Sequence, residues 1–177
     1  MSTYQIDPTH SCVQFQIRHL NIANIKGQFG KVTGAVDFDP ANPGASKVDA
    51  AIDVDSVLTR DEKRDAHLKT GDFFNTEAHP TITFKSKQVT AGGPDSFTVT
   101  GDLTFRGVTK ETALKVEGLT GEVKDMWGNL RRGASASARI NRGDFGLTFN
   151  APLEGGGFLL SDEVDVSIDL QMMRQPG

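Results

Sequence analysis

A shortage of cysteine, of cationic charge and of long apolar runs limits the classes of protein to which this 177-residue chain can belong. Its single cysteine, Cys12, cannot close a disulfide within the chain, so stability must come from the burial of apolar side chains. Lysine and arginine number 19 against 23 acidic residues, and a net charge of −4 argues against nucleic-acid binding. No apolar run approaches the roughly 20 residues that span a bilayer, so we expect a soluble protein with no membrane span.

The first residues also lack the pattern of an export signal. Residues 1–8 contain no basic stretch followed by an apolar one, which is the mark of a secretory leader. We therefore expect a cytoplasmic location, or a periplasmic one if a leader has been removed.

The sequence has none of the short motifs that accompany common catalytic or cofactor sites. It contains no Gly-x-Ser-x-Gly elbow, no Gly-x-Gly-x-x-Gly turn and no Walker loop. Its histidines are not at the spacings of zinc ligands, and the neighbours His10 and Ser11 would point to opposite faces of a strand. We predict no metal, no cofactor and no enzymatic activity. The four histidines are His10, His19, His67 and His79.

What the sequence does have is an alternation of apolar and polar residues, the pattern of half-buried strands. The alternation continues without a linker or a change of composition, which predicts one domain over residues 1–177. About eight such strands form a closed antiparallel barrel or a sandwich, and closure removes exposed edges. A shift of the alternation by one residue at Gly30-Lys31 predicts a β-bulge.

One segment, residues 59–69, has the pattern of a short helix instead. Thr59 followed by Glu62 predicts a capping box at its start. Because only Ala66 and Leu68 are apolar within it, the helix either lies over one end of the barrel or is a solvated connector.

Glycine or alanine occupies many of the predicted inward positions of the strands. An eight-stranded barrel is near the size at which side chains either fill the interior or enclose one small ligand, so small residues favour a hollow barrel. The competing explanation is that inward glycines mark bulges and corners, and that alanines face large residues of the opposite wall. If the barrel is hollow, Gly101→Leu or Ala136→Phe should weaken ligand binding while preserving the fold. The small inward positions are Gly27, Gly34, Ala50, Gly101, Gly118, Ala134, Ala136 and Ala138.

Several short segments occur in an order that matches one known family. They are Asp7-Pro8-Thr9-His10-Ser11, Arg18-His19-Leu20, Arg64-Asp65-Ala66-His67-Leu68-Lys69, Asp72-Phe73-Phe74-Asn75, His79-Pro80, Ile82-Thr83-Phe84-Lys85-Ser86, Gly101-Asp102-Leu103-Thr104-Phe105-Arg106-Gly107-Val108-Thr109-Lys110 and Ile140-Asn141-Arg142-Gly143-Asp144-Phe145-Gly146-Leu147. Together they resemble the YceI-like family of polyisoprenoid-binding or lipid-binding proteins. The resemblance implies an all-β fold: an extended eight-stranded antiparallel lipocalin-like β-barrel with one short α-helix near residues 60–69. It also implies a long apolar pore that holds a polyisoprenoid or a similar long-chain amphiphile, such as an isoprenoid quinone.

We accordingly predict a carrier or store for a long-chain amphiphile, with apolar side chains along the pore and charged side chains against the head group. The charged residues near strand ends, among them Asp65, Lys69 and Arg142, have a second interpretation as local ion pairs that tie loops together. The predicted pore residues are Phe15, Ile17, Phe29, Phe84, Leu103, Phe105, Phe145 and Leu147. The predicted head-group residues are Arg18, His19, Arg64 and His67.

Two other functions are compatible with the same sequence. An enzyme acting on an isoprenoid or lipid guest would use His10 or His19 with a nearby carboxylate as acid and base. A barrel that serves only for interactions would be packed solid, without an internal channel. A homodimer is the commonest oligomer, although the sequence shows no diagnostic patch for one.

Overall fold

The computed structural model describes all 177 residues and shows one antiparallel sheet of twelve strands with a single α-helix. The helix is α1 (Glu62–Leu68), and three short 3₁₀ helices cover Pro43–Ala45, Val54–Ser56 and Arg142–Phe145. The strands are β1 (Ser2–Ile6), β2 (Cys12–His19), β3 (Ala23–Phe29), β4 (Val32–Phe38), β5 (Lys47–Asp53), β6 (Val57–Leu58), β7 (Thr81–Ala91), β8 (Phe97–Phe105), β9 (Val108–Glu117), β10 (Val123–Lys124), β11 (Leu130–Asn141) and β12 (Leu160–Arg174).

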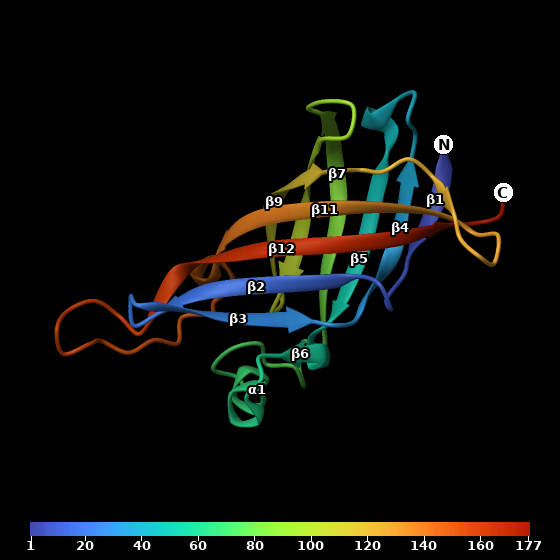
Figure 1. Cartoon of the computed structure of the whole chain (residues 1–177). Coiled ribbons are helices and arrows are strands. Elements are labelled where there is room, and N and C mark those ends of the chain that lie inside the picture. The colour runs from blue at the N-terminus through green and yellow to red at the C-terminus, as the bar shows by residue number, and fades with distance from the viewer.

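Eight of these strands form a closed barrel. Their order is β11-β9-β8-β7-β5-β4-β1-β12, and the ring closes because β12 also pairs with β11. That pairing runs the length of both strands, from Arg131↔Met173 to Asn141↔Glu163. The eight-stranded antiparallel barrel predicted from the sequence is therefore confirmed, and so is a short helix near residues 60–69 (Figure 1).

The fifteen-residue strand β12 pairs with three other strands. One edge pairs with β11, and the other is divided between β1 at its C-terminal end and β2 over the rest. The strands β3 and β6 continue the sheet outward from β2. The β2–β3 hairpin therefore extends the barrel wall along β12, away from the two chain termini (Figure 1).

The predicted β-bulge at Gly30-Lys31 is wrong. β3 ends at Phe29 and β4 begins at Val32, and the two strands have different partners in the sheet. The shift in alternation arises because the chain passes from one part of the sheet to another between two buried side chains. A register shift of the kind that a bulge produces lies instead in β7, between Ser86 and Gln88.

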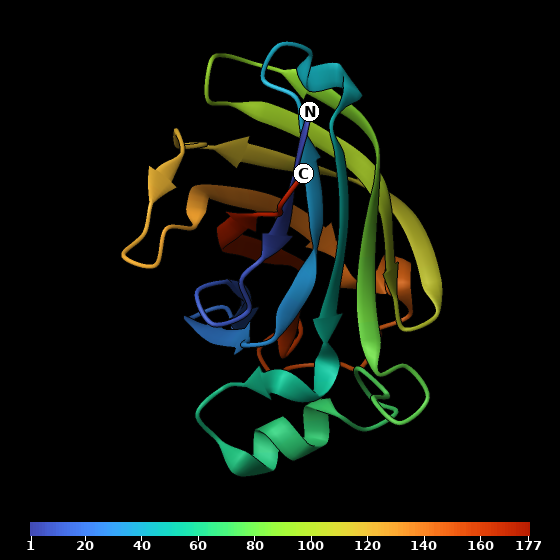
Figure 2. The same cartoon turned by 90° about the vertical axis from the view of Figure 1, so that its right-hand side faces the viewer.

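The cap predicted for α1 is also wrong, although the helix is where it was expected. Asp61 is the N-cap residue, and its carboxylate accepts a hydrogen bond from the amide of Arg64 at 3.0 Å. Thr59 is buried and donates both its amide and its hydroxyl to Asp65 Oδ1. α1 lies across one side of the barrel, beside β6 (Figures 1 and 2), and its Leu68 packs against the core, so the helix is more than a solvated connector.

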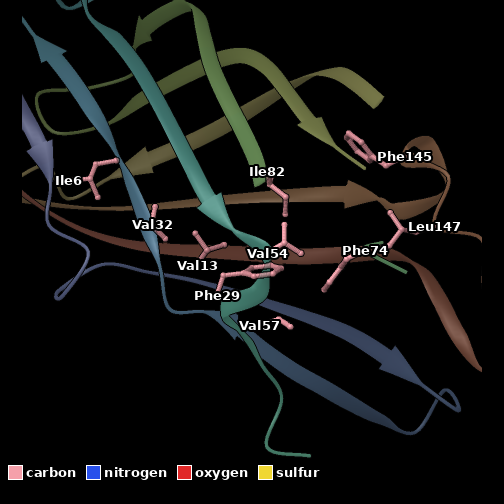
Figure 3. Close-up of a cluster of buried hydrophobic side chains, with 10 residues drawn as sticks. All are labelled: Ile6, Val13, Phe29, Val32, Val54, Val57, Phe74, Ile82, Phe145 and Leu147. Carbon is pink, nitrogen blue, oxygen red and sulfur yellow. The ribbon is translucent and has the colours of Figure 1, made fainter. Parts of the chain in front are cut away.

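Two clusters of buried apolar side chains lie inside the sheet. Few residues are fully buried, 25 of 177, so most inward apolar side chains keep some accessible surface. The first cluster, gathered between the strands in Figure 3, contains Ile6, Val13, Phe29, Val32, Val54, Val57, Phe74, Ile82, Phe145 and Leu147. The second contains Tyr4, Val36, Phe38, Phe84, Val89, Phe97, Val99 and Met172.

Candidate ligand-binding site

The barrel encloses a cavity of about 590 Å³, within the range of roughly 300–1,000 Å³ that is typical of small-molecule sites. Its lining includes every second residue of β12 from Leu160 to Met172 except Asp162. At about 3.4 Å per strand residue, this wall is roughly 40 Å long. The cavity is therefore long and narrow, a shape that suits an extended chain.

The cavity wall is almost entirely apolar, because 38 of its 45 lining residues are hydrophobic. The alternation seen in the sequence accounts for this, since each strand turns its apolar face inward and its polar face to solvent. The seven other lining residues are His19, Ser46, Thr59, Arg64, His67, Thr83 and Arg142.

The alanines predicted to face inward do line the cavity. Ala134, Ala136 and Ala138 of β11 are on its wall together with Ala50 of β5. The intervening serines face outward, and Ser135 Oγ donates to Asp169 Oδ1 at 3.2 Å on the outer surface. Methyl side chains at three successive inward positions of β11 leave the space that larger side chains would fill.

Gly27 and Gly101 do not mark open space inside the barrel, because each allows a neighbouring group to approach the backbone closely. A Cβ atom at Gly27 would lie 2.3 Å from the Phe15 ring, which covers this glycine across the β2–β3 pair. A Cβ atom at Gly101 would lie 2.3 Å from the carbonyl oxygen of Lys85, beside the register shift in β7. The expectation that Gly101→Leu preserves the fold is therefore wrong. None of the four glycines predicted to face inward, Gly27, Gly34, Gly101 and Gly118, lines the cavity.

Most of the predicted pore residues are on the cavity wall. Phe145 is the exception, because it is 2% exposed and packs behind the wall, with its ring centroid 5.7 Å from that of Phe105. The predicted pore residues that line the cavity are Phe15, Ile17, Phe29, Phe84, Leu103, Phe105 and Leu147.

Of the predicted head-group residues, His19, Arg64 and His67 line the cavity and Arg18 does not. Arg18 alternates with His19 on β2 and lies on the outer face of the strand. Its guanidinium donates to Asn24 Oδ1 at 3.4 Å and to the carbonyl oxygen of Asn21 at 3.1 Å. Arg18 therefore ties the β2–β3 hairpin together.

The cavity has an end that we call the mouth, lined by His19, Phe149, Leu159 and Leu160, whose side chains are all partly exposed. The β2–β3 turn and the loop before β12 meet there, because the amide of Leu20 donates to the carbonyl oxygen of Leu159 at 2.9 Å. In Figure 1 these two loops form the left-hand end of the molecule.

Two side chains from the α1 segment line the cavity, and one of them, His67, contacts the mouth. His67 packs edge-on against Phe149, with ring centroids 5.2 Å apart, and its Nε2 lies 2.8 Å from Asp72 Oδ2. Arg64 Nε donates to Thr59 Oγ1 at 2.8 Å, which holds the guanidinium against the buried threonine. Both residues thus have a protein partner and still contribute to the cavity wall.

Arg142 is the most deeply buried charge on the wall. Arg142 is 6% exposed, and its Nε donates to the carbonyl oxygen of Ser161 at 2.8 Å. Its Nη1 donates to the carbonyl oxygens of Leu147 and Phe149 at 2.7 and 2.8 Å. Burial lowers the pKa of the Arg142 guanidinium, because the charged form loses hydration. The sequence offered Arg142 either as a head-group residue or as part of a local ion pair, and the structure shows no ion pair, because its partners are backbone carbonyls.

The opposite end of the cavity is closed. Phe38, Phe97 and Met172 are buried there, and the Arg132 guanidinium lies 5.4 Å from the centroid of the Phe38 ring. Arg132 Nε also donates to the hydroxyl of Tyr4 at 2.9 Å. Burial is the main cause that raises the pKa of Tyr4.

Of the two histidines that the enzyme interpretation offers, His10 and His19, only His19 lines the cavity. His10 is exposed and its Nδ1 lies 2.9 Å from Asp7 Oδ2, outside the lining residues. His19 lines the cavity, but no carboxylate lies within 4.0 Å of its ring nitrogens. No group of three or more His, Cys, Asp or Glu side chains is placed to hold a metal ion. No helix of this protein has the length and apolar character needed to cross a membrane.

Comparison with known proteins identifies the family. The model of the YceI-like domain matches residues 4–172. The chain belongs to the YceI-like family. This YceI-like protein is 38% identical to a UPF0312 protein of Pseudomonas aeruginosa over 174 residues, covering 97% of this chain and 87% of that one. It is also 38% identical to a UPF0312 protein of Staphylococcus aureus over 164 residues, 93% of each chain.

Solved structures share the barrel. A Campylobacter jejuni YceI protein is 33% identical, with a TM-score of 0.76 and 90% of each chain covered. Burkholderia cenocepacia BcnA has a TM-score of 0.81 at 23% identity, covering 94% of this chain and 98% of that one. A polyisoprenoid binding domain from Saccharophagus degradans has a TM-score of 0.71 at 18% identity, covering 99% and 100%. The last two likenesses show the fold alone, and the YceI-like barrel fits a binder of a hydrophobic ligand.

Proposed function

We propose that this YceI-like protein binds a long-chain amphiphile, a polyisoprenoid or an isoprenoid quinone, inside its barrel and carries or stores it without chemical change. The observation that supports this most strongly is the long apolar cavity. An apolar chain that moves from water into such a cavity gains roughly 0.8 kcal/mol for each buried CH₂ group. The fold shared with the polyisoprenoid binding domain of Saccharophagus degradans gives further support.

In the proposed complex the apolar chain extends along β12 and the polar end stays at the mouth. The titratable lining residues His19 and His67 are at this end, and Arg64 lies one helical turn before His67 on α1. Toward the closed end, the polar lining residue is the uncharged Ser46, which accepts a hydrogen bond from the amide of Asp39 next to Phe38. An amphiphile in the reverse orientation would lose the hydration of its head group without gaining a charged partner.

The proposal is tested with protein purified gently and without detergent. We expect native mass spectrometry to show a bound species, and organic extraction to release a lipid with a long apolar chain. Titration of the extracted protein with solanesol, a polyprenol, or with an isoprenoid quinone should then restore a stoichiometric complex. Repeated absence of a co-purified lipid, together with no binding in either titration, would overturn the proposal.

A further inference from the structure

Arg142 has hydrogen-bond donors that the protein does not use. A guanidinium carries five N–H donors, one on Nε and two on each terminal nitrogen. Three of these are directed at the carbonyl oxygens of Ser161, Leu147 and Phe149. The two donors of Nη2 have no partner in the protein, and Arg142 is on the cavity wall.

Arg142 also lacks a counter-ion. No carboxylate oxygen lies within 4.0 Å of its guanidinium. The exposed Asp162 attracts the Arg142 charge electrostatically, but from a longer distance. Arg131 makes the contrast clear, because its side chain is more exposed, at 19%, and yet bonds both Asp7 and Asp125. A buried charge is costly unless it is paired, so the Arg142 site is electrostatically incomplete in the protein alone.

We propose that Arg142 binds an anionic head group, a carboxylate or a phosphate, of the amphiphile held in the cavity. This inference rests on the proposed function and narrows its ligand class. The Arg142 carbonyl partner Phe149 contacts His67, so an anion on Nη2 would also lie close to the cationic side of the mouth. A cationic head group would meet an uncompensated buried charge of the same sign and be rejected.

The decisive experiment compares ligands that share one chain and differ only in the head group. Oleate, oleyl phosphate, oleyl alcohol and oleylamine are titrated, each below its critical micelle concentration, into extracted wild-type protein. We expect one or both anions to bind at least tenfold more tightly than the alcohol, and the amine to bind most weakly. Preference for oleate or for oleyl phosphate identifies which anion the site takes.

A pair of arginine variants assigns the preference to the residue. Arg142→Gln should reduce the ratio of anion to alcohol affinity to near one while the alcohol still binds. Arg139→Gln is the matched control, because Arg139 lies near the same end of β11 on the outer face and pairs with Asp165 and Glu163. It should leave the ratio unchanged.

The outcomes separate this inference from the proposed function. Equal affinity of the wild type for all four ligands, or a preference for the amine, would overturn the role of Arg142 and leave the carrier proposal standing. Failure of every ligand to bind, with failure of the solanesol and quinone titrations, would overturn both. If Arg142→Gln does not fold, the comparison of head groups on the wild type still decides.

Discussion

Ala136 controls how much room the cavity has at its middle. Its methyl group faces inward from β11, opposite Val116 of β9 and Ile168 of β12 in the sheet register. We expect Ala136→Phe to place a ring in the ligand's path and to lower the affinity for solanesol at least tenfold. The loss of stability should stay below the roughly 1–3 kcal/mol of an over-packed core, because the cavity accepts the ring.

Isothermal titration and urea unfolding measure the two effects of Ala136→Phe. Ser137→Phe is the control, since the next residue of the strand is exposed on the outer face and pairs with Ser167. Wild-type affinity in the Ala136 variant would show that the ligand does not pass this point.

Asp7, which follows β1 and bonds Arg131 of β11, predicts a pH dependence of stability. A bond to His10 is the main cause that lowers the Asp7 pKa from 3.8 to about 2, and Arg131 and the Thr9 amide assist. Because the Asp7 carboxyl has a lower pKa in the folded protein than in the unfolded chain, its ionised form stabilises the fold at pH values above the unfolded pKa. This stabilisation is lost as the pH falls from about 4 to 2. We expect Asp7→Asn to lower the free energy of unfolding by about 1 kcal/mol at neutral pH, allowing for solvent screening.

The check for Asp7 is urea unfolding at a series of pH values. The difference between Asp7→Asn and wild type should shrink as the pH approaches 2. The exposed Glu154 makes no side-chain bond, so Glu154→Gln is the control. A difference that stays constant with pH would contradict the assignment.

Period-two alternation determined which single residues could be placed from the sequence. It turns Phe15, Ile17 and His19 to one face of β2, and by the same rule it turns Arg18 to the other. Treating both Arg18 and His19 as head-group residues ignored that rule. Arg142 could not be placed in this way, because its position is fixed by carbonyls that only the fold brings together.

At the scale of elements, the pair of strands β7 and β8 depends on Gly101. A Cβ atom at Gly101 would lie only 2.3 Å from the carbonyl oxygen of Lys85, so a side chain there forces the strands apart. We expect Gly101→Ala to lower the free energy of unfolding by roughly 1–3 kcal/mol, measured in urea. Gly155→Ala is the control and should change stability by less than about 0.5 kcal/mol, because a Cβ atom there meets nothing within 4 Å. Equal effects of the two substitutions would contradict this account.

The helix α1 shows why element boundaries are harder to predict than elements. Both Thr59 and Asp61 are residues that cap helices, and each precedes a polar residue three positions later. The choice is made by tertiary contacts, since Thr59 is buried against Arg64 and Asp65 and is not free to cap. Local patterns contain no information on that burial.

At the scale of the whole molecule, the closed barrel could be predicted, but the division of β12 between β1 and β2 could not. One-sided alternation requires the strands to cover a common interior, which allows a barrel or a sandwich, and the resemblance to the YceI-like family implied the closed barrel. The pairing of a strand with two successive neighbours along one edge depends on lengths and register across the sheet. The sequence pattern of β12 shows only its inward face.

Because the interior is hollow, ligand and stability are linked across the whole barrel. A ligand that binds only the folded protein stabilises it by about 2.7 kcal/mol at a concentration of 100 times Kd. We expect saturation with solanesol to raise the Tm of extracted protein by roughly 5–10 °C, measured by calorimetry. The Ala136→Phe variant should show a smaller rise at the same concentration. An unchanged Tm of the wild type would contradict the linkage.

The place of β12 in the ring also bears on biosynthesis. β12 is the last barrel strand to leave the ribosome, and it supplies partners to β1, β2 and β11. Without β12 the sheet is divided into two parts, the strands from β10 to β1 and the strands β2, β3 and β6, each with free edges and an uncovered apolar face. Such surfaces favour aggregation, so a nascent chain of this protein should rely on chaperone protection until its final strand is released.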